Sequence, residues 1–544
     1  MAAEMSASAT VAHSFETREN VASFWERMVV EHRLQGNLTI SGFFARTAKR
    51  LPLKRALVYK HHVYTYRELF QAVAGVALHL QKNLNVKSGN KVAMLLENSD
   101  LYNIWYLAVL ATGAVAVPLN CKLTPREIEF MLVDSSASML LSEKSFHDIL
   151  LELAPDVRGR LDVVMVGRND QPEPSLWDLE QANVPIEAPA AIYYTSGTTG
   201  KPKGVVHTHR SLIAGALQGA LAWEYPQEWV VNLATTPLFH IANHTVFLPT
   251  LGTGGTLVVD TFKTDHIFEL IQKHKVTNFF AVPSMLLLMT QSAQRSRYDL
   301  GSVVRVAFGA APMPVNKLQA VQEMFPNAAL VHGMGQTECS GTTVTLPSTK
   351  AFEKAGSVGI NISGTEIRIV DNAGQELPAN AVGELVMRGP NVMSHYLDRP
   401  EATSETLRDG WLHTGDLGFR DDEGYVYLVD RKKDMIIRGG ENIYSTEVEQ
   451  VLYMLPEVAS AAVVGMPSDL FGEEVLACLV KKNGERELTL AEVQAHCAKH
   501  LAKFKQPVAL RYIAAMPQTA TGKTQKAELK AMLIREFAKG AVHV

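Results

Sequence analysis

A run of small, hydroxyl-bearing and basic residues, Tyr193 to Gly204, most constrains what this chain can fold into. It reads Tyr-Tyr-Thr-Ser-Gly-Thr-Thr-Gly-Lys-Pro-Lys-Gly and follows an apolar segment, residues 188–194, that predicts a buried strand. A helix is predicted further on, at about Ser211 to Leu221. Glycines let a backbone approach an anion closely, and consecutive N–H groups with hydroxyls form an anion-binding concavity. The stretch therefore predicts a loop that wraps the phosphates of a nucleotide.

The spacing of this loop excludes the common phosphate loop of NTPases. That pattern requires a glycine, four residues, and then Gly-Lys-Ser/Thr. Counting from Gly197 places the second glycine at a position that holds Pro202. A later Gly-Lys-Thr at residues 522–524 would need a glycine where Pro517 stands. A different kind of phosphate loop is therefore expected.

The Thr/Ser/Gly/Lys run instead resembles the phosphate loop of the adenylate-forming superfamily. That group includes acyl-CoA and aryl-CoA synthetases, peptide-synthetase adenylation domains and firefly-type luciferases. Further segments resemble superfamily motifs in the expected order, and the resemblance covers roughly residues 55 to 530. These segments are Leu330–Glu338, Trp411–Asp416, Asp430–Asn442 and Pro517–Lys523.

The length of 544 residues argues for two or more domains, and 47% hydrophobic with 20% charged residues is ordinary for a globular protein. Strands and helices alternate from about residue 60 to residue 330, which favours a layered α/β fold with largely parallel sheets. We expect a large N-terminal adenylation domain, residues 1–432, with a small β-rich subdomain at about 345–430. A small α+β domain, residues 433–544, should follow, and the resemblance implies that it is mobile about a hinge near Lys433, where a charge cluster precedes a glycine pair.

The net charge and the placement of the cysteines limit the kinds of partner and the cellular compartment that we expect. The net charge of −4 gives no sign of a nucleic-acid surface. The four cysteines are scattered without a Cys-x-x-Cys pair, and the N-terminus has no apolar signal core. Leu101 to Leu119 is better explained by a helix leading into a buried strand than by a membrane span. A cytoplasmic enzyme is expected, with its oligomeric state open, a homodimer included.

The resemblance implies a set of nucleotide-binding residues. Glu338 is expected to hold Mg²⁺, with Thr195 beside it, because a carboxylate next to a triphosphate requires a hard cation between them. Asp416 is suited to accept both ribose hydroxyls, and Arg431 should lie near ribose or phosphate. Met334 stands where the superfamily has an aromatic residue, which weakens any expectation of ring stacking on adenine. The full expected set is Thr195, Ser196, Gly197, Thr198, Thr199, Gly200, Lys201, Lys203, Gly309, Ala310, Ala311, His332, Gly333, Met334, Gly335, Gln336, Thr337, Asp416, Arg431 and Lys523.

Other residues are expected to serve the acid and the thiol. Lys523 and His240 join Glu338 as expected catalytic residues, although His240 could also be an ordinary core histidine. The resemblance places the glycine pair on a face that swings towards the pantetheine channel. The expected acyl pocket is Trp223, Phe239, His240, Val282, Gly309 and Gly333, and the expected CoA site is Gly439, Gly440 and Glu441.

The implied reaction is AMP-forming acyl-CoA synthesis. A carboxylate attacks the α-phosphorus of ATP, pyrophosphate leaves, and the acyl-adenylate then transfers its acyl group to CoA. The pocket residues are apolar or neutral, which favours a monocarboxylic acid with a medium-chain fatty, branched, thioether or aryl tail. The alternatives are a stand-alone enzyme that loads a carrier protein, a luciferase-like oxidative activity and a non-catalytic nucleotide-binding module.

Overall fold

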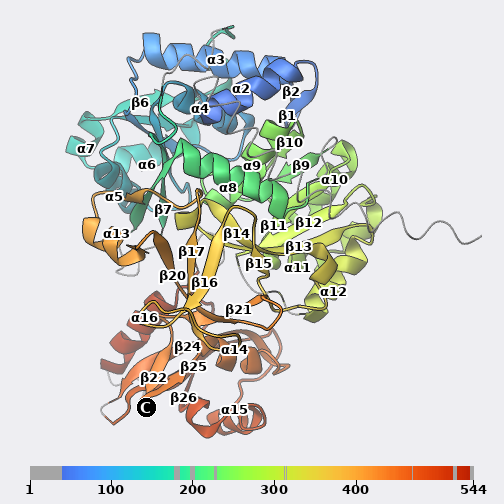
Figure 1. The fold of residues 1–544 in the computed structure, drawn as a ribbon, viewed down its shortest axis with the longest axis vertical. Coiled ribbons are helices and arrows are strands. Elements are labelled where there is room, and N and C mark those ends of the chain that lie inside the picture. Colours follow the sequence, from blue (N-terminus) through green and yellow to red (C-terminus); the bar gives the residue numbers. More distant parts are fainter. Residues whose placement is uncertain are drawn as a thin grey trace, which may run out of the picture.

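A computed structural model describes residues 39–176, 184–195, 202–225, 230–310, 313, 315–468, 470–518 and 524–538. Its fold is mixed α/β, with a large N-terminal part and a small C-terminal unit, as expected (Figure 1). Two large sheets form the N-terminal part, a smaller antiparallel sheet follows, and a fourth sheet belongs to the C-terminal unit. The C-terminal unit is drawn in orange to red at the lower end of Figure 1.

The nine-stranded sheet is parallel at its centre and antiparallel at its edges. Its order is β15-β14-β13-β12-β11-β9-β10-β1-β2. The neighbours from β13 to β1 pair in parallel, whereas β14, β15 and β2 run antiparallel to their neighbours. The strands are β1 (Arg55–Tyr59), β2 (His62–Thr65), β9 (Val231–Ala234), β10 (Thr256–Val259), β11 (Asn278–Ala281), β12 (Arg305–Gly309), β13 (Ala329–Gln336), β14 (Gly341–Leu346) and β15 (Ile360–Asn361).

The seven-stranded sheet has the order β18-β8-β7-β4-β3-β5-β6. Its strands β4, β3, β5 and β6 are parallel, and fully buried runs such as Val115–Pro118 are typical of strands covered on both faces. The strands are β3 (Lys91–Leu95), β4 (Val115–Pro118), β5 (Met139–Ser142), β6 (Asp162–Met165), β7 (Pro189–Thr195), β8 (Lys203–Thr208) and β18 (His395–Tyr396).

Helices fill and cover the two large sheets, giving five layers. The main hydrophobic core joins α2, α3, α4, α8 and α9 to inward residues of both sheets. A second core packs α10, α11 and α12 on the other face of the nine-stranded sheet, and a third packs α5, α6 and α7 on the seven-stranded sheet. The helices are α2 (Ile40–Arg50), α3 (Tyr66–Lys82), α4 (Asp100–Ala111), α5 (Pro125–Ser135), α6 (His147–Glu152), α7 (Pro155–Gly159), α8 (His209–Ala222), α9 (Ile241–Thr253), α10 (Thr264–His274), α11 (Pro283–Gln291) and α12 (Val315–Met324).

Two smaller sheets complete the described fold. An antiparallel sheet carries the β-rich segment, and the C-terminal sheet has α14 and α15 on one face and α16 on the other. Helix α13 (Pro400–Thr406) lies beside the β-rich segment. The remaining elements are β16 (Glu366–Val370), β17 (Gly383–Arg388), β19 (Leu407–Arg408), β20 (Trp411–Arg420), β21 (Val426–Arg431), β22 (Ile436–Arg438), β23 (Glu441–Ile443), β24 (Val458–Ser468), β25 (Gly472–Lys481), β26 (Ala509–Tyr512), α14 (Ser445–Leu452), α15 (Leu490–Cys497) and α16 (Lys526–Ala538).

The segment after the phosphate-loop sequence differs from the sequence-based expectation. A helix alone was expected there, but the chain first returns as strand β8, antiparallel to β7, before α8 begins. Val205 and Val206 are buried in this strand, and Thr208 caps the helix that follows. Thr195 and Lys203 are therefore partners across the ladder, and the phosphate-loop sequence connects the two strands.

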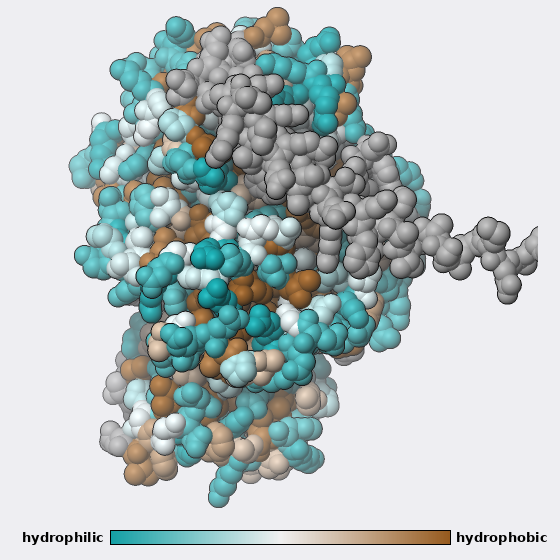
Figure 2. Space-filling view, viewed as in Figure 1, coloured by the Kyte–Doolittle hydropathy of each residue, from teal (hydrophilic) through white to brown (hydrophobic). Residues whose placement is uncertain are grey.

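The described surface is largely hydrophilic in the view of Figure 2. Among the residues that the structure describes, no helix combines the length and apolar character needed to cross a membrane. All four cysteines are free thiols.

Candidate active site

A short segment at the carboxyl end of β13, Gln336 to Glu338, joins two groups of polar side chains. β13 pairs in parallel with β12, and ligands of α/β proteins bind where such strands end. A 3₁₀ turn, Thr337–Cys339, follows the strand at once. At this turn the Gln336 and Glu338 side chains point to different partners. One short backbone segment therefore connects the two groups of polar side chains.

The first group centres on Glu338. The Tyr396 hydroxyl donates to Glu338 Oε1 at 2.8 Å, and the backbone oxygen of Glu338 accepts from Met393 N at 2.8 Å. The Lys203 ammonium lies 4.9 Å from the centre of the Tyr396 ring. Burial and the Glu338 charge raise the pKa of Tyr396, so it remains a donor at neutral pH. Tyr396 thus connects the expected metal ligand with a lysine of the expected phosphate loop.

The second group centres on Asp416, which is only 6% exposed. Gln336 Nε2 donates to Asp416 Oδ2 at 2.7 Å and to the Thr414 carbonyl at 3.0 Å. Arg431 faces Asp416 across β20 and β21, with its Nε 3.4 Å from Asp416 Oδ1. The adjacent Gly415 has φ +70°, a conformation that favours glycine. The structure therefore holds the expected ribose carboxylate in a fixed orientation.

His207 fixes the turn that carries Glu338. It is fully buried, and its Nε2 lies 2.7 Å from the Thr337 carbonyl. Its Nδ1 lies 3.0 Å from the hydroxyls of both Ser211 and Ser340. Burial lowers the pKa of His207 to about 4, partly offset by the Thr337 carbonyl. The neutral imidazole therefore donates from Nε2 to Thr337 and accepts at Nδ1.

Three glycines near the expected site are required by their protein neighbours. A Cβ atom at Gly309 would lie 2.1 Å from the Gly333 oxygen, and one at Gly333 would lie 2.4 Å from Trp223 Cη2. At Gly335 the clash would be 1.6 Å, with the Gly341 oxygen. Ala310, directly after β12, has φ +69°, which is strained for a residue with a side chain. Backbone strain of this kind gathers at functional sites.

Two expected nucleotide residues turn their side chains into the protein. His332 stacks on Phe308 at 4.9 Å, and its Nδ1 lies 3.0 Å from the Ser357 carbonyl. Met334 lies in a buried apolar cluster with Val205 and Cys339. Any role of His332 in nucleotide binding is therefore restricted to its backbone.

The expected acyl pocket lies beside this edge of the sheet. His240 is the N-cap of α9, and its Nδ1 accepts from Ala242 N at 3.1 Å, so the neutral ring carries its hydrogen on Nε2. Asn98 holds the preceding turn, accepting from Leu238 N at 2.8 Å. Phe239 and Val282 are half-buried, whereas Trp223 is 2% exposed.

The expected thiol site lies on the C-terminal unit. Gly439 and Gly440 form the two-residue turn between β22 and β23, with φ values of +59° and +89°. Positive φ at both positions is the geometry that tight hairpins require. Glu441 is exposed, and so is Lys433, in the turn between β21 and β22.

Several predicted site residues lie outside the described part of the chain. These are Ser196, Gly197, Thr198, Thr199, Gly200, Lys201, Ala311 and Lys523. On the C-terminal loop, Gln518 and Thr524 pair across an isolated antiparallel bridge, and Gln525 N donates to the Pro517 oxygen at 2.8 Å.

Sequence reasoning missed Tyr396, His207 and Asn98. Each forms a hydrogen bond with a partner more than fifty residues away in the sequence, so no local motif predicts its role. A histidine inside an otherwise apolar strand is the signal that could have found His207, in β8, but Asn98 and Tyr396 do not lie in such strands.

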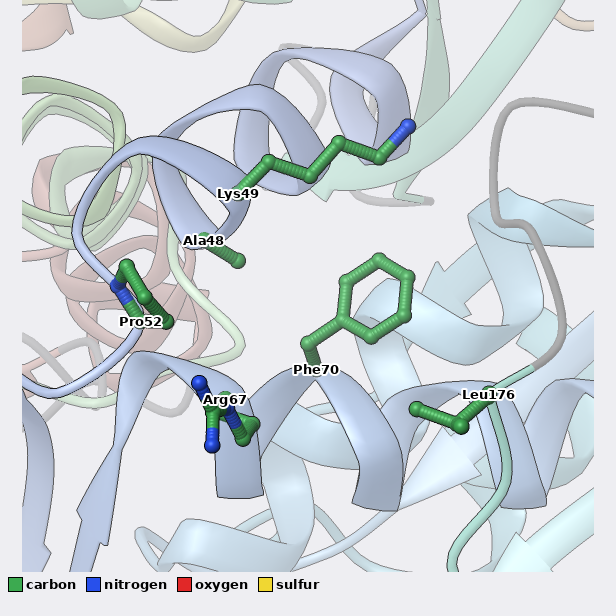
Figure 3. A pocket seen from close by; sticks show the side chains of 6 residues that line it. All are labelled: Ala48, Lys49, Pro52, Arg67, Phe70 and Leu176. Carbon is green, nitrogen blue, oxygen red and sulfur yellow. The ribbon is translucent and has the colours of Figure 1, made fainter.

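A surface hollow of about 380 Å³ lies elsewhere, between α2, α3 and Leu176 (Figure 3). Phe70 turns towards it, and Lys49 and Arg67 border it. None of the expected site residues lines it, so it plays no part in the site described above.

Comparison with known proteins identifies the family. Residues 44–397 match the AMP-binding enzyme family and residues 447–523 match its C-terminal domain. A feruloyl-CoA synthase of an Amycolatopsis species is 35% identical over 496 residues, covering 91% of this chain and 99% of that protein. The chain therefore belongs to the family of AMP-binding enzymes. It is an AMP-forming acid–thiol ligase of the acyl-CoA synthetase class.

Solved structures agree with this assignment. The o-succinylbenzoate CoA synthetase of Bacillus subtilis, in complex with its acyl-adenylate intermediate, superimposes with a TM-score of 0.79 at 31% identity, covering 90% of this chain and 97% of the other. The same enzyme with ATP and a magnesium ion gives a TM-score of 0.80 at 32% identity, covering 90% and 99%.

Proposed function

We propose that this acyl-CoA ligase activates an aryl carboxylic acid with ATP and Mg²⁺, releasing pyrophosphate, and passes the acyl group from acyl-AMP to CoA. The relatives reported above are named for the acyl groups of aryl acids, feruloyl and o-succinylbenzoyl. The observation that carries the proposal is the Gln336–Glu338 segment. It joins the carboxylate suited to a ribose, Asp416, to the carboxylate suited to a cation beside phosphates, Glu338.

The residues present fit a magnesium ion held jointly with substrate. Within the described ranges, no cluster of three or more His, Cys, Asp or Glu side chains could hold a metal ion alone. Mg²⁺ needs no such cluster, since it is usually bound by one or two carboxylates together with substrate phosphates. Glu338, oriented by Tyr396, supplies that carboxylate, and Thr195 ends the strand that leads into the phosphate loop. The ion would neutralise phosphate charge during attack.

Charge repulsion is the main barrier that these residues must lower. Two unit charges 4 Å apart at intermediate dielectric repel by about 4 kcal/mol, which corresponds to roughly a thousandfold in rate. Lys203, packed on Tyr396, and the proposed catalytic lysine, Lys523, place positive charge where carboxylate and triphosphate meet. This is electrostatic preorganisation, and no protein nucleophile takes part.

His240 is proposed to position the acid. Its Nδ1 is committed to the start of α9, so only Nε2–H can donate to a carboxylate or acyl-adenylate oxygen. Asp416 and Arg431 are proposed to bind the ribose. The turn formed by Gly439–Glu441 is proposed to bind the pantetheine arm of CoA. We also propose that Lys433 is the hinge between two domains, residues 1–432 and 433–544. A cytoplasmic location is part of the same proposal.

The test is AMP and pyrophosphate formation from ATP and Mg²⁺ across aryl, straight-chain and branched acids, each with and without CoA. The proposal expects acid-dependent AMP formation that CoA stimulates strongly and that is fastest with aryl acids. Fastest turnover with alkyl acids would overturn the aryl assignment. Acid-dependent pyrophosphate exchange without turnover on CoA would instead favour loading of a carrier protein.

A further inference from the structure

The short segment Tyr396–Arg399, at and after the end of β18, contacts three separate parts of the large domain. Its tyrosine donates to the Glu338 carboxylate, as described above. The N–H of its leucine donates to the Gly204 carbonyl, on β8, at 2.8 Å. Nη2 of its arginine donates to Asp134 Oδ1, on α5, at 2.6 Å. One segment therefore reaches the expected metal ligand, strand β8 and helix α5.

Asp134 stands in the last turn of α5, where a carboxylate is poorly placed. The carbonyl groups at a helix C-terminus carry partial negative charge, which destabilises a nearby anion. The side chain is also only 10% exposed, so its charge needs partners within the protein. Arg399 supplies the opposite charge, and the Tyr194 hydroxyl donates to Asp134 Oδ2 at 2.9 Å. Asp134 therefore connects Arg399 to Tyr194.

Tyr194 lies next to the residue where β7 enters the phosphate-loop sequence. That residue is Thr195, the last of the strand, and Tyr194 itself pairs with Gly204 on β8. A Cβ atom at Gly204 would lie 3.3 Å from both Tyr194 Cζ and Leu397 Cβ, so the tyrosine ring and the segment meet over this glycine. Burial and the Asp134 charge raise the pKa of Tyr194, so its hydroxyl remains a donor at neutral pH. This hydroxyl connects the end of β7 to α5.

The Tyr396–Arg399 segment is itself fixed at both ends. Tyr396 pairs with Val205 across β18 and β8, and its N–H donates to the Thr403 hydroxyl at 3.0 Å. The same hydroxyl donates to the Arg399 carbonyl at 2.8 Å, at the start of α13. Because both of its ends are held, the segment can set the separation of the groups that it contacts.

We propose that Asp134 positions the ends of β7 and β8, between which the phosphate-loop sequence runs, relative to the Glu338 carboxylate. It acts through Tyr194 and Arg399, so it is a positioning residue and not a catalytic one. The inference rests on the proposed function, since it assumes that the phosphate loop and Glu338 meet the β- and γ-phosphates of ATP with their magnesium ion.

The position of these strand ends should matter for ATP and not for AMP. AMP has no β- or γ-phosphate, so displaced strand ends leave its ribose contacts in place. The proposed ribose carboxylate, Asp416, belongs to a different sheet and keeps its own partners, Gln336 and Arg431. A loss of affinity confined to Mg·ATP therefore indicates a positioning defect, whereas a general loss of structure weakens the binding of both nucleotides.

The chain contains a closely matched group of side chains that serves as the control. Asp100, in the first turn of α4, is buried and accepts from the Tyr64 hydroxyl at 3.0 Å. It also accepts from both terminal nitrogens of Arg168, at 2.6 and 2.9 Å. This is again a Tyr–Asp–Arg group, but it joins β2, α4 and the turn at Arg168–Asp170, and not the strands that lead into the phosphate loop.

The test is isothermal titration calorimetry of Mg·ATP and of AMP, in the absence of acid, on the wild type, Asp134→Asn and Asp100→Asn. Asp134→Asn should raise the Kd for Mg·ATP about tenfold, the worth of one hydrogen bond to a charged group, and leave the Kd for AMP within about twofold. Asp100→Asn should leave the ratio of the two Kd values as in the wild type, even where it lowers the melting temperature as much as Asp134→Asn does.

Two further positions keep the test decisive if Asp134→Asn does not fold. Tyr194→Phe deletes only the hydroxyl that reaches Asp134, and it should raise the Kd for Mg·ATP about fivefold without changing that for AMP. Arg399→Met removes the charge, whereas Arg399→Lys keeps the charge but loses the planar guanidinium. The Kd for Mg·ATP of Arg399→Lys should therefore lie between the values of the wild type and Arg399→Met.

Three results would overturn the inference and leave the ligase assignment intact. These are equal weakening of Mg·ATP and AMP binding, an unchanged Kd for Mg·ATP in Asp134→Asn and Tyr194→Phe, and a change of the ratio in Asp100→Asn as large as in Asp134→Asn. If the wild type binds neither Mg·ATP nor AMP, the proposed function itself fails.

Discussion

The two regions proposed to serve the two half-reactions are built differently. On the large domain, Asp416 and Glu338 are held by Gln336 and Tyr396 through bonds of 2.7 and 2.8 Å. On the C-terminal unit, the Gly439–Gly440 turn is exposed, and a Cβ atom at Gly440 would meet nothing within 4 Å. The proposed adenylation site is thus preorganised by side-chain partners, whereas the proposed thiol site depends on backbone shape. Substitutions in the two regions should separate the half-reactions.

The largest effect is expected for Lys523→Ala, which removes the proposed catalytic lysine. Adenylate formation should fall about a thousandfold, because roughly 4 kcal/mol of charge repulsion is no longer offset. Thioester formation from supplied acyl-adenylate should be nearly unchanged. Single-turnover assays of each half-reaction measure this, with Lys530→Ala as the control, since Lys530 pairs with Glu473 on the same unit. Equal losses in both halves would refute the division.

Asp416→Asn probes the partner-held site. The KM for ATP should rise about 10- to 100-fold, since a charge-assisted hydrogen bond contributes about 1.5–3 kcal/mol. Initial rates over a range of ATP concentrations measure it. Asp421→Asn is the control. Asp421 is a carboxylate in the same sheet region and pairs with Lys354, so its substitution should leave the KM for ATP unchanged. An unchanged KM in Asp416→Asn would remove the ribose assignment.

Tyr396→Phe sharpens the comparison further, since it deletes one hydroxyl and leaves Glu338 in place. Adenylation should slow about tenfold, the value of one hydrogen bond to a charged group. More Mg²⁺ should be needed for half-maximal rate. Tyr64→Phe serves as the control. It loses a similar hydrogen bond, from the Tyr64 hydroxyl to Asp100 at 3.0 Å, at a position far from Tyr396 in the sequence. If both variants show the same magnesium dependence as the wild type, Tyr396 does not orient a metal ligand.

Gly440→Leu tests the region shaped by backbone alone. A side chain at φ +89° is strained by about 1–2 kcal/mol, so the turn should shift and thioester formation should slow roughly tenfold. Adenylate formation should stay at the wild-type rate. Gly424→Leu is closely matched, with φ +88° and no atom within 4 Å, but it lies in the β20–β21 turn. Similar behaviour of the two variants would count against a thiol site at Gly440.

The smallest effect concerns stability. His207 is buried with its pKa lowered to about 4, so the folded state stays unprotonated while the unfolded state binds a proton below about pH 6.5. Its stability contribution is present above pH 6.5 and declines as pH falls towards 4, by about 1–2 kcal/mol at pH 5. Urea unfolding at pH 7 and pH 5 should show a smaller pH difference for His207→Gln than for the wild type. His147 is exposed, so His147→Gln should retain the wild-type difference in stability between pH 7 and pH 5. If His207→Gln also retained that difference, His207 would not be a buried neutral imidazole.

Local features of the fold were predictable from sequence. The capping boxes at Thr65, Thr124 and Thr489 can be read from sequence, because both partners of each box lie within one helical turn. The strand before the phosphate-loop sequence was also found. Strand β8 was missed, since Lys203 and Gly204 resemble the end of a loop and only four residues follow before α8.

Long-range features of the site were not predictable in this way. The pocket residues considered from sequence included no basic side chain, yet Arg305 shares one side of the sheet with Gly309, a residue of the proposed acyl pocket. Asn278 and Arg305 stand at strand starts that read as ordinary apolar runs, and only the register brings them together. The Tyr396–Glu338 bond likewise spans 58 residues.

Rapid-quench analysis of the wild type with α-labelled ATP, Mg²⁺ and the aryl acid that it turns over fastest, followed by a CoA chase, tests the central claim most directly. The account predicts that acyl-AMP and pyrophosphate accumulate before CoA is added, and that the chase converts the adenylate to acyl-CoA and AMP. Formation of ADP, or appearance of AMP without a chaseable adenylate, would contradict it.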